Sequence, residues 1–333
     1  MKKRYENLDF LRGLASLGVL VGHSSWIIGL EDLGINTILV QDFSVAIFLS
    51  LSGFVIGINY KPYTFEFKDY VSKRFIRIFP LFFTCLLLTF ILDFIRFKLS
   101  FVNNHFESST NLSSFITSTL LLDHFFLLQY FTPGSKINLM FEEFGSNRVL
   151  WTLSLEWSIY MLYGFLFSKE SKTKKKLTIL LLPYIMTGCL SYFHTRIPFL
   201  SICWILGFII SLKRSHSILL LAVYSATVVV ITVFKNNEAI FLLTPIIVHC
   251  FNKINFYSSL VAFGNFTGNI SFSLYLCHYP IMLLVAPILI GYGQLFSFVT
   301  VNLVSLITSV ILYYFIDRNR KKLLLKLSIS TLR

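Results

Sequence analysis

The chain has 333 residues, of which 55% are hydrophobic and only 14% are charged. A soluble domain carries about 25% charged residues, so this composition excludes a soluble globular protein and indicates a polytopic membrane protein. The net charge of +13 would also suit a nucleic-acid-binding protein. Lysines and arginines in cytoplasmic loops explain that charge better, so we expect the lipid bilayer, and no nucleic acid, as a partner. All five cysteines fall in apolar runs, which favours neither a disulfide framework nor a metal site.

Hydrophobic runs predict about ten transmembrane helices in an all-α, polytopic helical bundle. The expected spans are 8–29, 41–59, 79–97, 150–168, 177–194, 198–212, 217–234, 238–251, 269–290 and 295–316. A further apolar stretch at 113–131 is interrupted by Asp123 and His124, which predicts an interfacial or re-entrant segment. We expect a single integral-membrane domain over 1–333 with no appended soluble domain.

The distribution of basic residues predicts the orientation. With ten spans, loops on the N-terminal side carry 22 of the lysines and arginines, and loops on the other side carry 5. Cytoplasmic loops are enriched in Lys and Arg, so both the N- and C-termini are expected to be cytoplasmic. The chain is then a multi-pass protein of the cytoplasmic (inner) membrane.

The first span, LDFLRGLASLGVLVGH, places Arg12 and His23 in an apolar helix. Their separation of eleven residues puts the two side chains about 20° apart on one face and about 16 Å apart along the axis. Asp9 and Ser16 share the face of Arg12 by i+3 and i+4 spacing. Ionisable groups in a membrane usually face a protein interior or an aqueous cavity and mark function. A snorkelling arginine and a structural histidine are the alternatives.

The fourth span contains WTLSLEWSIY, with Glu156 about 9 Å below the outer surface by helical rise. His23 lies at the same expected depth, so the carboxylate can pair with the imidazole, fix its tautomer and raise its basicity. The alternative is that Glu156 hydrogen-bonds another helix as a packing contact.

The segment KRFIRIFP precedes the third span and carries Arg74 and Arg77 on one helical face. Both lie at the depth of Arg12, so three arginines can clamp phosphates bidentately. Ordinary positive-inside charge is the alternative for this pair.

Two other segments add polar groups within spans. SVAIFLSLSGF offers Ser52 for ligand contact or for close helix packing, and ISFSLYLCHYPI places Tyr275 and His278 at mid-membrane depth. Pro280 frees a backbone carbonyl in the second segment. His278 either lines a cavity or bonds a neighbouring helix.

These segments together resemble the membrane-bound acyltransferase-3 family over nearly the whole chain. That family carries, in order, R-x10-H, F-x-LSGF, R-x-x-R-I-x-P, W-S/T-L-S-x-E and S-x-YL-x-H-x-P. The matching positions are Arg12 with His23, FLSLSGF at 48–54, Arg74 with Arg77, Ile78 and Pro80, Trp151 to Glu156, and Ser273, Tyr275, Leu276, His278 and Pro280.

The resemblance implies an O-acyltransferase that moves an acetyl group from acetyl-CoA, or another short acyl group from its acyl-CoA, to a hydroxyl of an extracytoplasmic polysaccharide such as O-antigen. No tightly bound cofactor is expected. It implies His23 and Glu156 as catalytic residues and Arg12, Arg74 and Arg77 as the CoA-binding residues. The expected substrate-binding residues are Ser52, Trp151, Tyr275 and His278. Some family members carry an extracytoplasmic domain, which a separate partner protein would have to supply here.

Two other functions compete with acyl transfer. A secondary transporter of a sugar or anion would use Arg12 and Glu156 as substrate and proton sites, but the two halves of the chain show no repeat. A glycan polymerase or flippase would place functional arginines in a large outer loop, and the loop at 98–149 carries few basic residues. The sequence does not separate direct transfer from an acyl-His23 intermediate.

Overall fold

A computed structural model of the chain describes residues 5–30, 37–99, 145–169, 196–212, 237–254 and 258–320. These residues form helices joined by turns, and no β-strand occurs among them. The expected spans at 177–194 and 217–234 and the expected interfacial segment at 113–131 lie outside the described residues. For the part of the chain that is described, the all-α fold class is confirmed.

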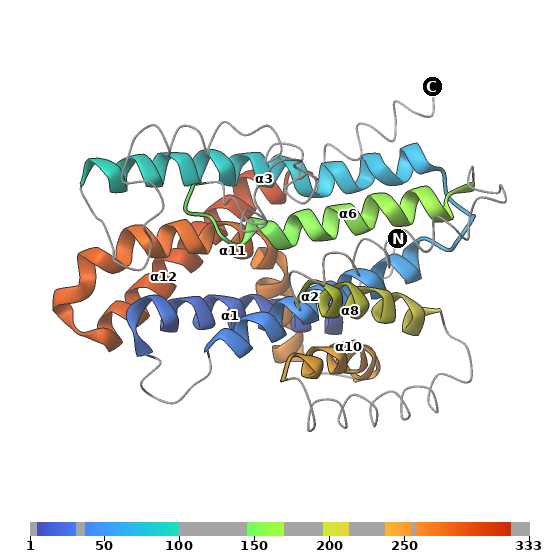
Figure 1. The fold of residues 1–333 in the computed structure, drawn as a ribbon, viewed down its shortest axis with the longest axis horizontal. Coiled ribbons are helices and arrows are strands. Elements are labelled where there is room, and N and C mark those ends of the chain that lie inside the picture. The colour runs from blue at the N-terminus through green and yellow to red at the C-terminus, as the bar shows by residue number, and fades with distance from the viewer. Residues whose placement is uncertain are drawn as a thin grey trace. The chain divides into compact units, whose positions relative to one another are not determined.

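The helices follow one another along the chain as coloured in Figure 1. They are α1 (Glu6–Ile28), α2 (Thr37–Asn59), α3 (Phe67–Lys98), α6 (Leu150–Phe167), α8 (Arg196–Ser211), the 3₁₀ helix η4 (Asn237–Leu243), α10 (Thr244–Lys253), α11 (Ser258–Leu289), the 3₁₀ helix η5 (Ile290–Tyr292), α12 (Gln294–Leu312) and the π-helix η6 (Tyr313–Asp317).

Within the described ranges, five helical segments are long and apolar enough to cross a bilayer, which needs about 20 residues. They are Glu6–Ile28, Leu39–Asn59, Phe67–Lys98, Leu260–Leu289 and Gln294–Asp317. Two shorter apolar helical segments are Phe199–Ser211 and Ile240–Lys253. The membrane character is thereby supported, whereas the count of ten spans and the cytoplasmic termini stay predictions.

Helix α3 begins at Phe67, well before the expected start of its span at 79. Its first turns are amphipathic: Tyr70, Arg74 and Ile78 are buried, whereas Lys68 before them and Lys73 between them are exposed. A spacing of four residues between buried positions is that of one helical face. Hydropathy alone missed these turns because their exposed face is charged.

Two other boundaries differ from the expected spans for similar reasons. Helix α11 begins at Ser258 rather than 269, because its first turns pair glycines with polar residues and still pack against α1. The expected span 238–251 consists of η4 and α10, with a change of helix type just before Pro245. A proline suits the first turn of a helix, where its missing N–H is not needed.

Contacts group the residues into two compact units, each assembled from segments far apart in the sequence. The first comprises Met1–Val19, Leu39–Val71 and Ile159–Asn269, and the second comprises Leu20–Ile38, Ser72–Ser158 and Ile270–Arg333. Helices α1, α2, α3, α6 and α11 contribute residues to both units. The expectation of a single domain over 1–333 stays a prediction.

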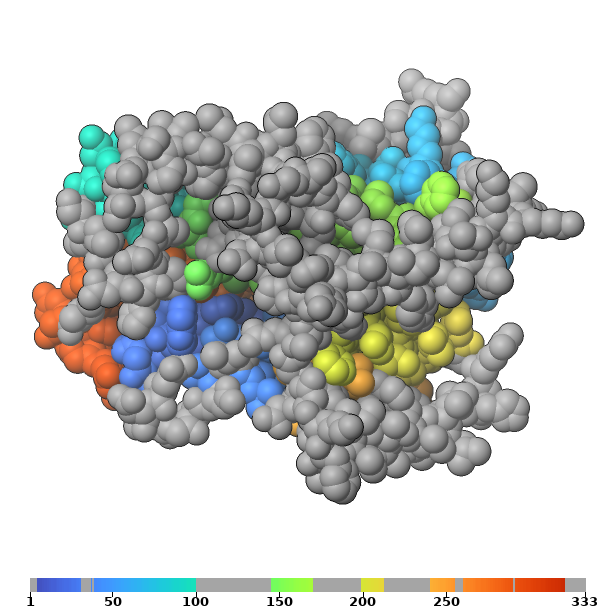
Figure 2. Space-filling model, viewed as in Figure 1, coloured from blue at the N-terminus to red at the C-terminus, as the bar shows by residue number. Residues whose placement is uncertain are grey.

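In the first unit, α2 and α8 approach until their backbones touch. A Cβ added to Gly53 would collide with the carbonyl oxygen of Trp204, and one added to Gly207 would collide with that of Ser50. Small residues allow this close packing in membranes, where apolar burial alone does not drive association. Ser50 Oγ also lies 2.7 Å from Thr244 Oγ1 of α10. Helix α8 packs on α10, and their atoms adjoin in the space-filling view (Figure 2).

In the second unit, buried polar groups hold the turn that precedes α6. Asp93 of α3 is only 6% exposed and accepts a 2.7 Å hydrogen bond from the backbone N–H of Ser146. Arg96 pairs with the same carboxylate at 3.1 Å. Gly145 has φ of 54° and faces Asp93, so a side chain there would meet both backbone strain and the carboxylate. The start of α6 is therefore anchored to α3.

The close contact between α2 and α8 can be tested by adding a methyl group to one of its glycines. We predict that Gly207→Ala lowers the stability of the protein by about 1–3 kcal/mol, because the new methyl group overpacks against the Ser50 backbone. Thermal unfolding in detergent measures the change. Gly291→Ala is the matched control, since its added Cβ has no atom within 4 Å. Equal melting temperatures for the two variants would contradict the packing described.

Candidate functional site

Two histidines meet in the second unit. Nδ1 of His23 in α1 lies 3.1 Å from Nε2 of His278 in α11, with ring centroids 5.1 Å apart. His23 is half-buried, whereas His278 is only 1% exposed. Of the two roles open for His278, the bond to a neighbouring helix is thus observed. A partly accessible imidazole beside a buried one can exchange a proton with a bound hydroxyl.

The second nitrogen of His278 and a tyrosine complete this pair. Nδ1 of His278 lies 2.9 Å from the carbonyl oxygen of Leu274, one turn earlier in α11. The ring of Tyr279 stands edge-on to that of His23, with centroids 5.1 Å apart and planes at 83°. Tyr279 is 1% exposed, so it restricts the movement of the His23 ring.

The backbone carbonyl that Pro280 leaves without a helical partner accepts a hydrogen bond from a side chain. Pro280 has no N–H, so the Leu276 oxygen lacks its usual partner four residues later. Nδ2 of Asn147 donates to this oxygen at 3.0 Å and to Thr89 Oγ1 at 3.1 Å. Asn147 is fully buried in the turn before α6. Sequence reasoning located the freed carbonyl and missed Asn147, since no spacing rule links positions so far apart.

Tyr275 and Trp151 lie where α11 and α6 contribute to the second unit. The Tyr275 hydroxyl hydrogen-bonds Thr152 and donates to the carbonyl oxygen of Val149 at 3.3 Å. Tyr275 is buried and Trp151 is half-buried in the first turn of α6. These bonds join α11 to the start of α6. Contact of either side chain with a substrate stays a prediction.

Glu156 lies in the middle of α6 and is half-buried. The next residue, Trp157, packs edge-on against Phe79 of α3 with centroids 5.0 Å apart. Glu156 and His23 belong to the same unit. Their direct pairing stays a prediction.

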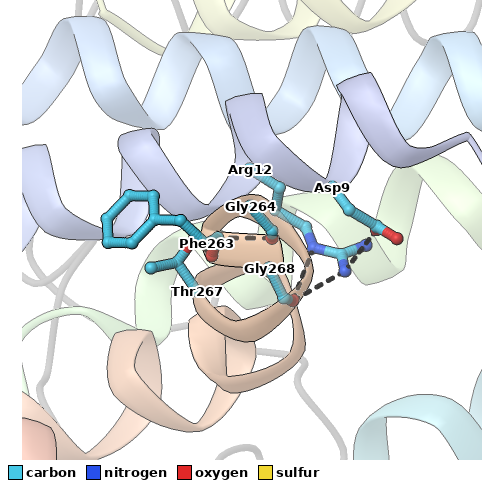
Figure 3. Close-up of polar contacts among 6 residues, drawn as sticks. All are labelled: Asp9, Arg12, Phe263, Gly264, Thr267 and Gly268. Carbon is cyan, nitrogen blue, oxygen red and sulfur yellow. Dashed lines mark hydrogen bonds and ion pairs between the residues drawn. The ribbon is translucent and has the colours of Figure 1, made fainter. Parts of the chain in front are cut away.

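Arg12 lies in the first unit, where its guanidinium links α1 to α11 (Figure 3). Nη2 pairs with Asp9 Oδ1 at 2.7 Å, which confirms the neighbourhood expected from i, i+3 spacing. Nη2 and Nε also donate to the carbonyl oxygen of Gly268, at 2.7 and 3.2 Å. The Arg12 side chain keeps 29% of its surface exposed. Arg12 can therefore both bond to α11 and bind an anion.

Glycines bring these two helices close enough for that bond. A Cβ on Gly13 would collide with Thr267, one on Gly264 with Phe10, and one on Gly268 with the Asp9 backbone. Thr267 turns its hydroxyl back to its own helix, donating to the Phe263 oxygen at 3.0 Å (Figure 3). The contact is therefore built from small residues on both helices.

Arg74 and Arg77 lie in α3, within the second unit. Arg74 is 8% exposed and Arg77 is half-buried. Arg320, which sequence reasoning did not single out, donates from Nη1 to the Arg77 carbonyl oxygen at 2.8 Å. The same nitrogen pairs with the buried Asp317 at 2.7 Å. Convergence of Arg74 and Arg77 with Arg12 of the first unit stays a prediction.

Ser52 ties α2 to two neighbours in the first unit. Its Oγ lies 2.7 Å from the Tyr160 hydroxyl and accepts a 3.1 Å hydrogen bond from Trp204 Nε1. These contacts support the packing alternative, and substrate contact stays a prediction. Among the described residues, no group of three or more His, Cys, Asp or Glu side chains is arranged to hold a metal ion.

Comparison with known proteins bears on the chemistry of this chain. Residues 5–318 match the model of a family described as an acyltransferase domain. The chain is also 28% identical over 181 residues to the O-acetyl transferase of Shigella phage Sf6, covering 52% of this chain and 49% of that protein. It thus matches about half the length of this curated relative. No solved structure matches the chain.

The family match extends over nearly the whole sequence and includes every helix from α1 to η6. It confirms the resemblance carried by the five short motifs. The chain therefore belongs to the acyltransferase-3 family.

Proposed function

We propose that the protein is an O-acetyltransferase of the cytoplasmic membrane that moves an acetyl group from cytoplasmic acetyl-CoA to a hydroxyl of an extracytoplasmic polysaccharide. Membership of an acyltransferase family supports the reaction type, and the name of the phage relative supports acetyl transfer to oxygen. The observation that carries the proposal is His23, a half-buried imidazole held by a second imidazole at 3.1 Å.

His23 acts as the general base. Its lone pair takes the proton of the acceptor hydroxyl while the oxygen attacks the thioester carbonyl, so that a C–O bond forms. The tetrahedral intermediate then collapses and the C–S bond breaks. The CoA sulfur leaves and receives the proton from His23, which returns the imidazole to its neutral state. An acyl-His23 intermediate is the variant of this route, in which the imidazole attacks the thioester first.

Glu156 is the carboxylate of the proposed site. A carboxylate stabilises an imidazolium that forms during proton transfer. Its half-buried position in α6, in the unit that also contains His23, supports this role. Ser52, Trp151 and Tyr275 are proposed to contact the acceptor.

Arg12, Arg74 and Arg77 are proposed to hold the phosphates of CoA. Guanidinium groups match phosphate oxygens bidentately. Arg12 keeps 29% of its side chain exposed despite its bonds to Asp9 and Gly268, so it retains surface for an anion. The pantetheine arm would then extend the thioester toward His23, about 16 Å along α1 by helical rise.

Replacing the base should abolish transfer. We predict that His23→Ala lowers the rate of acetyl transfer by at least about 10²-fold, the usual contribution of a general base. Membrane vesicles that contain the glycan, supplied with radiolabelled acetyl-CoA, measure the rate. Mass spectrometry of the surface glycan measures the product in cells.

His249→Ala is the control for that variant, because His249 lies in α10 of the first unit and has no role in the proposed site. It should keep wild-type activity. Undiminished acetylation by a correctly inserted His23→Ala protein would refute the mechanism. Glycan or anion flux that needs no acyl-CoA would instead indicate a transporter.

Removing a contact to the CoA phosphates should weaken binding of acetyl-CoA but not binding of a donor that lacks the phosphates. We predict that Arg77→Ala raises KM for acetyl-CoA by about 10-fold or more, since a charge-assisted hydrogen bond contributes about 1.5–3 kcal/mol. Arg320 binds the main-chain oxygen of Arg77, so this variant keeps that contact. Steady-state kinetics with acetyl-CoA and with S-acetyl-pantetheine, which lacks the phosphates, measure the effect.

The difference between wild type and Arg77→Ala should disappear with S-acetyl-pantetheine. Lys73→Ala is the matched control, because Lys73 lies on the same helix and is exposed. An equal rise in KM for both donors would exclude a phosphate contact at Arg77.

A further inference from the structure

We propose that His278 is a positioning residue that sets the tautomer of His23, so that the lone pair of His23 lies on Nε2. The inference rests on the proposed function only in naming His23 as the base. The tautomer itself follows from which atoms of three groups can donate or accept: the Leu274 carbonyl, His278 and His23.

The chain of hydrogen bonds starts at the backbone. The Leu274 oxygen can only accept, so the proton of the 2.9 Å contact belongs to Nδ1 of His278. His278 is 1% exposed, and a buried imidazole with no paired charge is favoured in its neutral form. A neutral ring with its proton on Nδ1 has a lone pair on Nε2. His278 therefore presents an acceptor to α1.

His23 must supply the next proton. Nε2 of His278 has none, so the 3.1 Å bond between the rings requires that Nδ1–H of His23 donates. Neutral His23 then carries its lone pair on Nε2, the nitrogen on the far side of the ring from His278. When Nε2 takes a proton from the acceptor, the Nδ1–H bond to His278 becomes charge-assisted and stabilises the imidazolium.

The side chain of His278 and the helical turn that carries it are both held by neighbouring groups. Leu274 holds Nδ1, and Asn147 caps the Leu276 carbonyl within the same turn. The ring of Tyr279 stands edge-on both to that of His278 and to that of His23. In the observed orientation, both ring nitrogens of His278 lie within hydrogen-bond distance of a partner.

Two substitutions of His278 distinguish the loss of its hydrogen-bond acceptor from the loss of its ring. In His278→Gln, the amide oxygen lies the same number of bonds from Cβ as Nε2, so it can accept from His23. In His278→Asn, the amide reaches only as far as Nδ1 and cannot contact His23. We expect His278→Asn to lower kcat by about 10²-fold with unchanged KM for acetyl-CoA, and His278→Gln to restore most of kcat.

Solid-state NMR of the nitrogen-15-histidine-labelled protein in lipid reports the tautomer directly. A His23→Gln difference spectrum assigns the His23 signals. We expect a protonated Nδ1 and a bare Nε2 on His23 in wild type and His278→Gln, and a changed or mixed tautomer in His278→Asn. Thermal unfolding of each variant shows that it folds. If His278→Asn does not fold, the wild-type spectrum and His278→Gln still test the inference.

A bare Nδ1 on His23 of the wild-type protein would overturn the inference, as would equal loss of kcat in folded His278→Gln and His278→Asn. A different result would refute the proposed function. If His23→Ala keeps its activity while the spectrum shows the expected tautomer, His278 still positions His23, and His23 is not the base.

Discussion

The close packing of α1 against α11 is the constraint on which the candidate site depends. In the first unit, Gly13, Gly264 and Gly268 remove the side chains that would separate the two backbones. In the second unit, the same two helices contribute His23 and His278, whose ring nitrogens lie 3.1 Å apart. Side chains larger than glycine would force the two backbones apart within the first unit, and within the second unit a hydrogen bond of 3.1 Å tolerates little displacement.

Several polar groups in the membrane-spanning helices are paired with nearby groups, which lowers the cost of placing them in a low-dielectric surrounding. Arg12 has both a carboxylate and a carbonyl oxygen as partners. Asn302 of α12 donates to Ser24 of α1 at 3.0 Å and to its own helix at 2.7 Å. Such bonds orient helices that apolar packing would leave free to rotate against lipid.

Sequence patterns predicted neighbours within a helix far better than partners between helices. The i, i+3 spacing of Asp9 and Arg12 correctly placed them together, because one helix has a fixed geometry. Matching depth suggested Glu156 as a partner of His23 and did not single out His278, whose ring the structure places against that of His23. Depth in the membrane gives only one coordinate of a side chain. Whether two side chains at equal depth meet also depends on how their helices pack and at which angle.

The boundaries of the spans show the same division between local and tertiary information. Hydropathy predicted α1, α2 and α6 within a few residues, because each is apolar over its length. It missed the first turns of α3, whose buried Tyr70, Arg74 and Ile78 alternate with charged residues. A helix that is half exposed needs a periodicity test rather than an average.

Pro280 shows how a local defect can make one helix depend on another. The proline leaves the Leu276 carbonyl without its intrahelical donor, and Asn147 supplies one from the turn before α6. That turn is held in place by Asp93 of α3 through the Ser146 N–H. A chain of hydrogen bonds thus runs from α3 through the turn to α11, two residues from His278. Without the proline, α11 would satisfy the Leu276 carbonyl by itself and Asn147 would lose this acceptor, which would leave the Tyr275 hydroxyl to join this turn of α11 to the start of α6.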